Sequence, residues 1–211
     1  MTYCVPINLK RVRLILNIFY TLLFLKNTTP LYDKGEIISM KKIIFTFITC
    51  LSLTCYSKEI TVPMYQVTST GIGSHIGTVT LQDSKDGLVI ETNLNNLPAG
   101  PHGFHIHEFA SCDPQKDKNG IMQAALAAGN HYDPHHTNHH AGPNGNGHLG
   151  DLPYLSVSEA GTNKIRFLMK NITVHQLKNK SLIIHENTDN YKDIPLPQGG
   201  SGLRIGCGII P

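Results

Sequence analysis

Short runs of alternating apolar and polar residues, separated by Gly, Pro and Asn, fill most of the chain after Ile60. Alternation with a period of two places successive side chains on opposite faces of a β-strand, and no helical period is sustained here. Turn signals such as Lys85-Asp86-Gly87 divide the runs. This pattern confines the chain to an all-β fold, a sandwich or a barrel. The predicted strands are residues 60–67, 75–82, 87–94, 102–108, 164–169, 181–185 and 203–209.

Residues 111–153 break this pattern, because they are rich in Gly, Pro, Asn and His and lack apolar alternation. We expect at most a short helical turn within them, around residues 123–128. A loop of this length in a compact domain is usually functional. It can bury little apolar surface of its own, so its histidines are the candidates for holding it in place.

Two further histidines precede this loop in the sequence HGFHIHE. His105 and His107 are two residues apart in a predicted strand, so their imidazoles leave the same face while Phe104 and Ile106 leave the other. Two imidazoles on one face can converge on one transition-metal ion. The spacing alone is weak evidence, because an exposed polar strand face explains it equally well.

The loop itself supplies three imidazoles and one carboxylate within 21 residues. Three nitrogens and one oxygen form a closed tetrahedral set suited to a structural Zn²⁺ ion, whose binding energy would replace the missing apolar core. The alternative is a solvated loop that binds metal loosely, which His135, His136 and His139 keep open, and His139 competes directly with His140. The predicted ligands are His131, His140, His148 and Asp151.

The net charge of +3 comes from the N-terminal part of the chain. Residues 1–57 hold seven Lys and Arg against two Asp and Glu, or +5, which leaves 11 − 13 = −2 for the rest. Nothing in the body of the chain therefore suggests a nucleic-acid partner.

Met40 is a second possible start of translation. Lys41 and Lys42 follow it and precede an apolar run over residues 43–53, after which small polar residues lead to Ser57. This order predicts a secretory signal peptide over residues 40–57. The run is shorter than the roughly 20 residues of a membrane span. A buried strand and a lipoprotein cysteine are the alternatives. Residues 1–39 are interpreted as an upstream extension with a start annotated too early, and residues 58–211 as the mature domain without a membrane anchor.

Only two of the five cysteines, Cys112 and Cys207, lie outside the predicted leader, since Cys4, Cys50 and Cys55 lie within it. An even pair in an exported domain predicts a disulfide. Its loop of about 95 residues could contribute roughly 4 to 5 kcal/mol in the chain-entropy model. Two buried free thiols are the alternative.

Five motifs, HGFHIHEFASC, GNHYDP, HHAGPNGNGHLGDLP, LIIHENTD and GLRIGCGII, resemble in this order those of the copper/zinc superoxide dismutases, particularly the exported bacterial branch. The similarity extends over nearly all of residues 60–210. It implies an eight-stranded Greek-key β-barrel, or sandwich, with long metal-binding and electrostatic loops, which agrees with the predicted strands.

The resemblance also implies roles for individual residues, with His131 shared between a copper and a zinc ion. Arg204 would lie beside the copper, Asp189 would link a copper histidine to a zinc histidine, and Cys112 would pair with Cys207. The implied copper ligands are His105, His107, His131 and His185. The implied zinc ligands are His131, His140, His148 and Asp151.

The implied activity is the dismutation of superoxide to oxygen and hydrogen peroxide in the periplasm, with copper cycling between two oxidation states. His131 would take up a proton and later return it, Arg204 would hold the anion, and Lys192 is a candidate for steering it. The rival is a non-enzymatic copper/zinc-binding protein of the same fold. A homodimer is left open, and His75, His102 and His175 are interpreted as surface or edge-strand residues.

Overall fold

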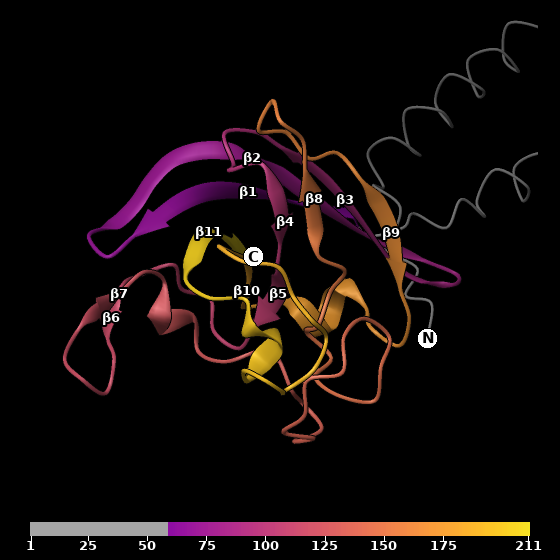
Figure 1. Cartoon of the computed structure of the whole chain (residues 1–211). Coiled ribbons are helices and arrows are strands. Elements are labelled where there is room, and N and C mark those ends of the chain that lie inside the picture. Colours follow the sequence, from indigo (N-terminus) through magenta and orange to yellow (C-terminus); the bar gives the residue numbers. More distant parts are fainter. Residues whose placement is uncertain (1–58) are drawn as a thin grey trace, which may run out of the picture. The chain divides into compact units, whose positions relative to one another are not determined.

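A computed structural model of the chain describes residues 59–211, so the predicted signal peptide and upstream extension lie outside the described residues. The described region belongs to a compact unit that spans Ser57–Pro211. It is built from strands β1 to β11 and three short 3-10 helices, η1 to η3 (Figure 1). None of its helices is long and apolar enough to cross a membrane.

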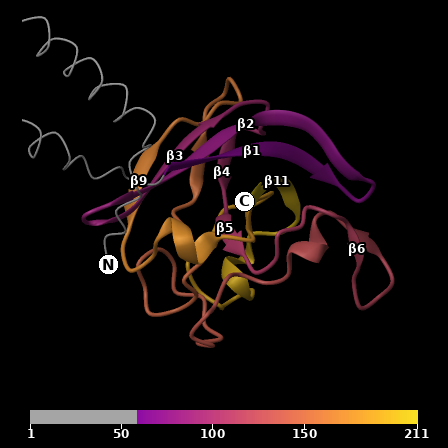
Figure 2. The same ribbon diagram turned by 180° about the vertical axis from the view of Figure 1, so that it is seen from behind.

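Seven strands form one antiparallel sheet in the order β5-β10-β11-β1-β2-β3-β9. The sheet curls, so that the long strands β1, β2 and β3 arch over β5, β10 and β11 in both views (Figures 1 and 2). These strands are β1 (Glu59–Thr68), β2 (Gly71–Ser84), β3 (Gly87–Leu94), β5 (Phe104–His107), β9 (Arg166–Met169), β10 (Lys180–His185) and β11 (Arg204–Ile210).

A second, two-stranded sheet pairs β4 (Gly100–His102) with β8 (Leu155–Val157). Only Gly103 separates β4 from β5, so one stretch of chain takes part in both sheets. With that stretch counted once, the two sheets contain eight strands. The chain crosses from β3, near one end of the seven-stranded order, through β4 to β5 at the other end, as in a Greek key. The all-β prediction is confirmed.

The core lies inside the curled sheet and follows the alternation of the sequence. In β3 the side chains of Leu88, Ile90 and Leu94 are buried while Glu91 and Asn93 between them are exposed. All four residues of β5 are buried, because Phe104 and Ile106 join the core whereas the two histidines face the loops. Burial on both faces makes β5 a rigid support for those histidines.

The segment predicted to be a loop contains little regular structure: β6 (Gln115–Lys116), β7 (Met122–Gln123) and η1 (Leu126–Ala128). The helical turn expected around residues 123–128 is present as η1. The disulfide between Cys112 and Cys207, with 5.8 Å between the Cα atoms, joins this segment to β11 and confirms the predicted pairing. The short strand β8 was not predicted from the sequence.

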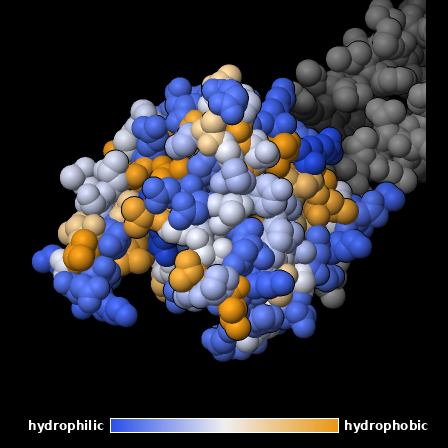
Figure 3. Space-filling model, in the orientation of Figure 1, coloured by the Kyte–Doolittle hydropathy of each residue, from blue (hydrophilic) through white to orange (hydrophobic). Residues whose placement is uncertain are grey.

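Two further 3-10 helices follow, η2 (Val174–Leu177) and η3 (Gln198–Gly200). Thr173 and Gln176 form a capping box at the start of η2. On the face shown in Figure 3, apolar residues are scattered among polar ones. Single exposed apolar residues are normal on a protein surface.

Candidate metal centre

Four imidazoles meet on the outer side of the sheet, beneath the loops. The pairing of β5 with β10 and an isolated bridge between His107 and His131 bring the four together. Each is at most 6 % exposed. One ring nitrogen from each lies within 4.8 Å of one from every other, and the four residues are His105, His107, His131 and His185.

Protein partners already occupy one nitrogen of two of these rings. The Nδ1 atom of His107 lies 3.0 Å from the Gly129 carbonyl oxygen, and Nδ1 of His185 lies 3.2 Å from that of Gly202. Their remaining Nε2 atoms face each other at 3.4 Å. A backbone carbonyl oxygen can only accept a hydrogen bond, so Nδ1–H is the donor, and each Nε2 is the unprotonated atom of a neutral ring and is available to a metal.

His105 is oriented the other way. Its Nε2 lies 2.7 Å from Asp189 Oδ2, and its Nδ1 is buried without a hydrogen-bond partner. His131 directs Nδ1 to Asp151 Oδ1 at 3.0 Å, which leaves Nε2 for this group. Buried polar atoms without partners are rare in folded proteins. Four imidazole nitrogens pointing at one another therefore fit a transition metal such as copper.

A second group surrounds the Asp151 carboxylate. Besides His131, the Nδ1 atoms of His140 and His148 lie 2.9 and 3.3 Å from its oxygens. Despite these short distances, neither of these two Nδ1 atoms makes a hydrogen bond, and both are buried. Three nitrogens and one carboxylate oxygen form the donor set that zinc prefers. The two groups share His131, which offers Nδ1 to one and Nε2 to the other.

Asp189 connects the two groups through the outer nitrogens of their rings. Its Oδ2 lies 2.7 Å from Nε2 of His105 and its Oδ1 lies 2.8 Å from Nε2 of His140. Gly199, with φ of 76°, passes so close that an added Cβ would collide with Asp189 Oδ1. Glycine at this position lets the backbone cover the carboxylate.

Burial determines the protonation of the imidazoles. It lowers the pKa of His131 to about 3, with a further decrease from the neighbouring His105 ring. Burial also lowers the pKa of His107 and His185 well below the ordinary value. For His140, burial lowers the pKa but contacts with Asp151 and Asp189 outweigh it and raise it to about 9. Most of the site thus holds neutral rings suited to metal binding, whereas His140 must lose a proton.

Arg204, the first residue of β11, lies beside His107. Its two terminal nitrogens donate to the carbonyl oxygens of Ala125 and Gly129, each at 2.6 Å. The Gly129 oxygen is the one that His107 also contacts. Burial lowers the pKa of Arg204 to about 10, so the side chain is still cationic at neutral pH.

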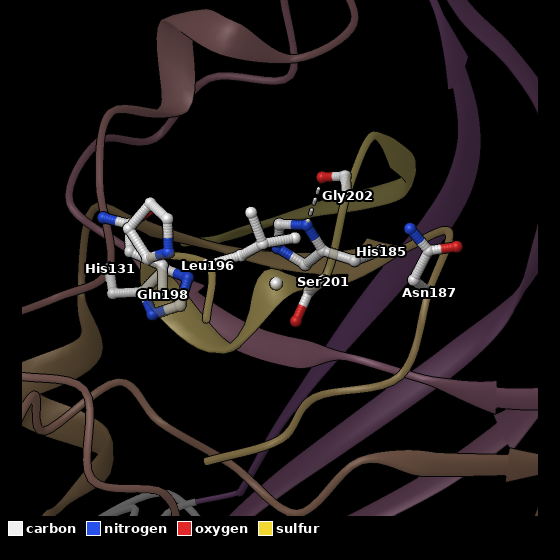
Figure 4. Close-up of a pocket in the computed structure, with 9 residues that line it drawn as sticks. His131, His185, Asn187, Leu196, Gln198, Ser201 and Gly202 are labelled. Carbon is white, nitrogen blue, oxygen red and sulfur yellow. Dashed lines mark hydrogen bonds between the residues drawn. The ribbon is translucent and has the colours of Figure 1, made fainter. Parts of the chain in front are cut away.

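A cavity of about 270 Å³ opens onto the imidazoles of His131 and His185 (Figure 4). Its walls contain no carboxylate, and the other lining residues are Asn187, Leu196, Pro197, Gln198, Gly200, Ser201 and Gly202. A second cavity of about 290 Å³ reaches His131 and His148, but Glu108, Asp133 and Asp193 line it. The first cavity therefore suits a small anion better.

The other histidines differ in their surroundings. His139 is exposed and contacts Asp193 at 2.8 Å, so it does not replace His140 in the second group. His135 and His136 are exposed, as are His75 and His175, which agrees with the surface prediction for the last two.

His102 lies on an edge strand, β4, as one of the two predicted alternatives had it, but it is not at the surface. This residue is 3 % exposed, and its ring contacts the carbonyl oxygens of His185 at 2.8 Å and of Pro98 at 2.9 Å. It thus holds the backbone of one member of the four-imidazole group. No local pattern indicates this role, because a histidine beside a glycine at a strand end has no recognisable spacing to a partner 83 residues away.

The sequence pattern described as copper/zinc superoxide dismutase (SODC) matches residues 75–210. The chain belongs to this family. Among curated relatives, the superoxide dismutase [Cu-Zn] of Brucella abortus is 42 % identical over 161 residues, which cover 76 % of this chain and 92 % of the relative.

Solved structures agree with this assignment to the copper/zinc superoxide dismutases. The Cu/Zn superoxide dismutase from Brucella abortus is 43 % identical with a TM-score of 0.69, and the match covers 73 % of this chain and all of that one. The solution structure of the monomeric copper, zinc superoxide dismutase from Salmonella enterica gives a TM-score of 0.64 at 43 % identity with the same coverage. A β-barrel fold and a copper/zinc centre are therefore features of this chain's family.

Proposed function

We propose that this protein converts superoxide to oxygen and hydrogen peroxide at a copper/zinc centre whose ligands are the two groups described above. The copper ligands are His105 through Nδ1 and His107, His131 and His185 through Nε2. The zinc ligands are His131, His140 and His148 through Nδ1, together with Asp151. The observation that carries the proposal is the shared His131 ring, because a metal-binding site alone would not require an imidazole with both nitrogens committed.

The chain's own residues bind the substrate and control its protons. Copper supplies the one-electron reduction and oxidation, and zinc holds the loop. Arg204, held by two carbonyl oxygens beside His107, attracts the superoxide anion toward the four-imidazole group. With Nδ1 of His131 proposed as a zinc ligand, Nε2 would be the ring nitrogen that takes up a proton and returns it to the departing peroxide.

We further propose that the enzyme acts outside the cytoplasm, in the periplasm. Residues 40–57 would be removed as a signal peptide, residues 1–39 would not be translated, and residues 58–211 would form the mature enzyme. The disulfide supports this location, because such bonds persist in oxidising compartments. Mass spectrometry of whole cells tests the start, because a peptide from residues 1–39 would contradict it, and mass spectrometry of the exported protein tests whether that protein begins near residue 58.

The rival function is a copper/zinc-binding protein without catalysis. Purified, metal-loaded protein should accelerate superoxide decay after a radiolytic pulse, in proportion to its copper content. Full occupancy by both metals with no acceleration would leave only the rival. Matched samples loaded with zinc alone should be inactive, since zinc has no second oxidation state.

A further inference from the structure

Tyr191 occupies a backbone conformation that is unusual for its type. Its φ is 58°, in the left-handed region that bulky side chains rarely adopt. In this conformation its N–H donates to Asp189 Oδ1 at 2.7 Å. The same oxygen lies 2.8 Å from Nε2 of His140. The backbone of Tyr191 therefore fixes the carboxylate that connects the two metal groups.

The side chain of Tyr191 packs against two other segments. Its ring stacks on that of Tyr154, with centroids 6.1 Å apart and an angle of 26° between the planes. Its hydroxyl oxygen accepts the backbone N–H of Tyr154 at 3.0 Å. On another side it rests on Gly142, where an added Cβ would lie 2.8 Å from the Cγ atom of Tyr191. Gly142 has φ of 69°, so a side chain there would also strain the backbone.

These contacts join three segments whose relative positions determine the geometry of the metal centre. Gly142 follows the ligand His140 by two residues, and Tyr154 follows the ligand Asp151 by three. Tyr191 follows Asp189 by two. One ring thus lies between both ligand-bearing stretches of the zinc loop and the turn that holds the connecting carboxylate.

We propose that Tyr191 is a positioning residue whose ring locks Asp189 between His105 and His140 and so couples the zinc site to the copper site. This inference rests on the proposed ligands. A strained backbone persists only where its surroundings hold it. Without the ring, residue 191 relaxes, its N–H leaves Asp189, and the carboxylate no longer orients the two imidazoles.

The test compares Tyr191→Ala, Tyr191→Leu and Tyr191→Phe in the full protein loaded with both metals. Zinc release to a chromophoric chelator and the electron paramagnetic resonance spectrum of Cu(II) are measured. Loss of an outer partner of a ligand costs roughly 10- to 100-fold in metal affinity, so zinc should leave about 10-fold faster from the Ala and Leu variants. Their copper spectra should shift toward that of zinc-free protein, while Tyr191→Phe should restore the wild-type spectrum.

Tyr65→Leu is the matched control, because Tyr65 contacts His75 on the sheet and touches neither metal group. Tyr191→Leu keeps a larger apolar side chain than Ala but removes the ring, so the test stands if the Ala variant does not fold. Wild-type zinc release and copper spectra in both small variants would overturn the inference, as would a Phe variant as impaired as Ala. Failure of the proposed function is a separate result, visible as wild-type protein that holds neither metal or leaves superoxide decay unchanged.

Discussion

Arg204 places a positive charge beside His107 without being one of the proposed metal ligands. Its two nitrogens are held by carbonyl oxygens of the loop and not by other side chains. We therefore expect Arg204→Ala to keep both metals and lose the larger part of its rate, about 10-fold or more at low salt. Pulse radiolysis at two ionic strengths measures this. Arg166→Ala, which removes an exposed arginine paired with Glu91, should behave as wild type, and an unaltered rate in Arg204→Ala would refute the steering role.

Asp151 contacts three imidazoles, so its loss should act on the zinc group as a whole. Asp151→Ala is expected to release zinc while copper stays bound, because the copper group takes no atom from this carboxylate. Metal analysis after dialysis provides the measurement. Asp86→Asn, at an exposed turn beside Lys85, is the control. Zinc retained at the wild-type level in the Asp151 variant would show that the ligand set is wrong.

The buried histidines predict how the stability of the metal-free protein depends on pH. The pKa of His131 falls from 6.5 to about 3 on folding, so its contribution is present above pH 6.5 and is lost as the pH falls toward 3. His140 has the opposite sign: its pKa rises to about 9, so its contribution is complete below pH 6.5 and is lost as the pH rises through 9. Urea midpoints of the chelated protein should therefore decline on both sides of a maximum. A midpoint that does not change between pH 6.5 and 4 would contradict this reasoning.

The disulfide connects the barrel to the loop that positions Arg204. Cys112 begins the segment whose Ala125 and Gly129 carbonyls hold the guanidinium, and Cys207 lies on the same strand as Arg204. Replacing both cysteines by Ser should lower the free energy of unfolding by about 2 to 5 kcal/mol. It should also lower the rate beyond any loss of copper, because the loop no longer fixes Arg204. Urea unfolding and copper-normalised activity test both effects. Full activity per copper would show that Arg204 keeps its position without the disulfide.

Strands that alternate apolar and polar residues were predictable from the sequence, and β3 has the predicted bounds. Residue spacing alone predicted the four-imidazole group only in part, because His105 and His107 are two residues apart whereas His185 depends on the pairing of β10 with β5. The family resemblance was needed to add His185. β8 was missed because three residues are too few to show a period. Tyr191 was missed for a related reason: the long-range contacts that hold a left-handed turn leave no local pattern.

Two kinds of force hold the described part of the chain. Apolar burial inside the curled sheet stabilises the strands, since its core residues from Val62 to Ile210 are almost fully inaccessible. The long loops instead converge on polar groups: Asp151 and Asp189 contact histidines from several segments. A metal ion that binds the folded state but not the unfolded chain stabilises the folded state by mass action. The loops, more than the barrel, should depend on the metals.

Removal of both metals by a chelator should therefore lower the melting temperature and make residues 111–153 and 187–202 sensitive to protease, while the strands stay protected. Zinc alone should restore most of the protection, because the proposed zinc ligands all come from residues 131–151, whereas copper alone takes only His131 from that stretch. Limited proteolysis with mass-spectrometric mapping of the cut sites gives the measurement, at equal occupancy of each metal. If copper alone protected the loop as well as zinc does, the shared His131 would be enough to hold the loop, and the other three zinc ligands would not be needed for this. Cuts inside β1 to β3 of the metal-free protein would instead mean that the barrel itself needs the metals to fold.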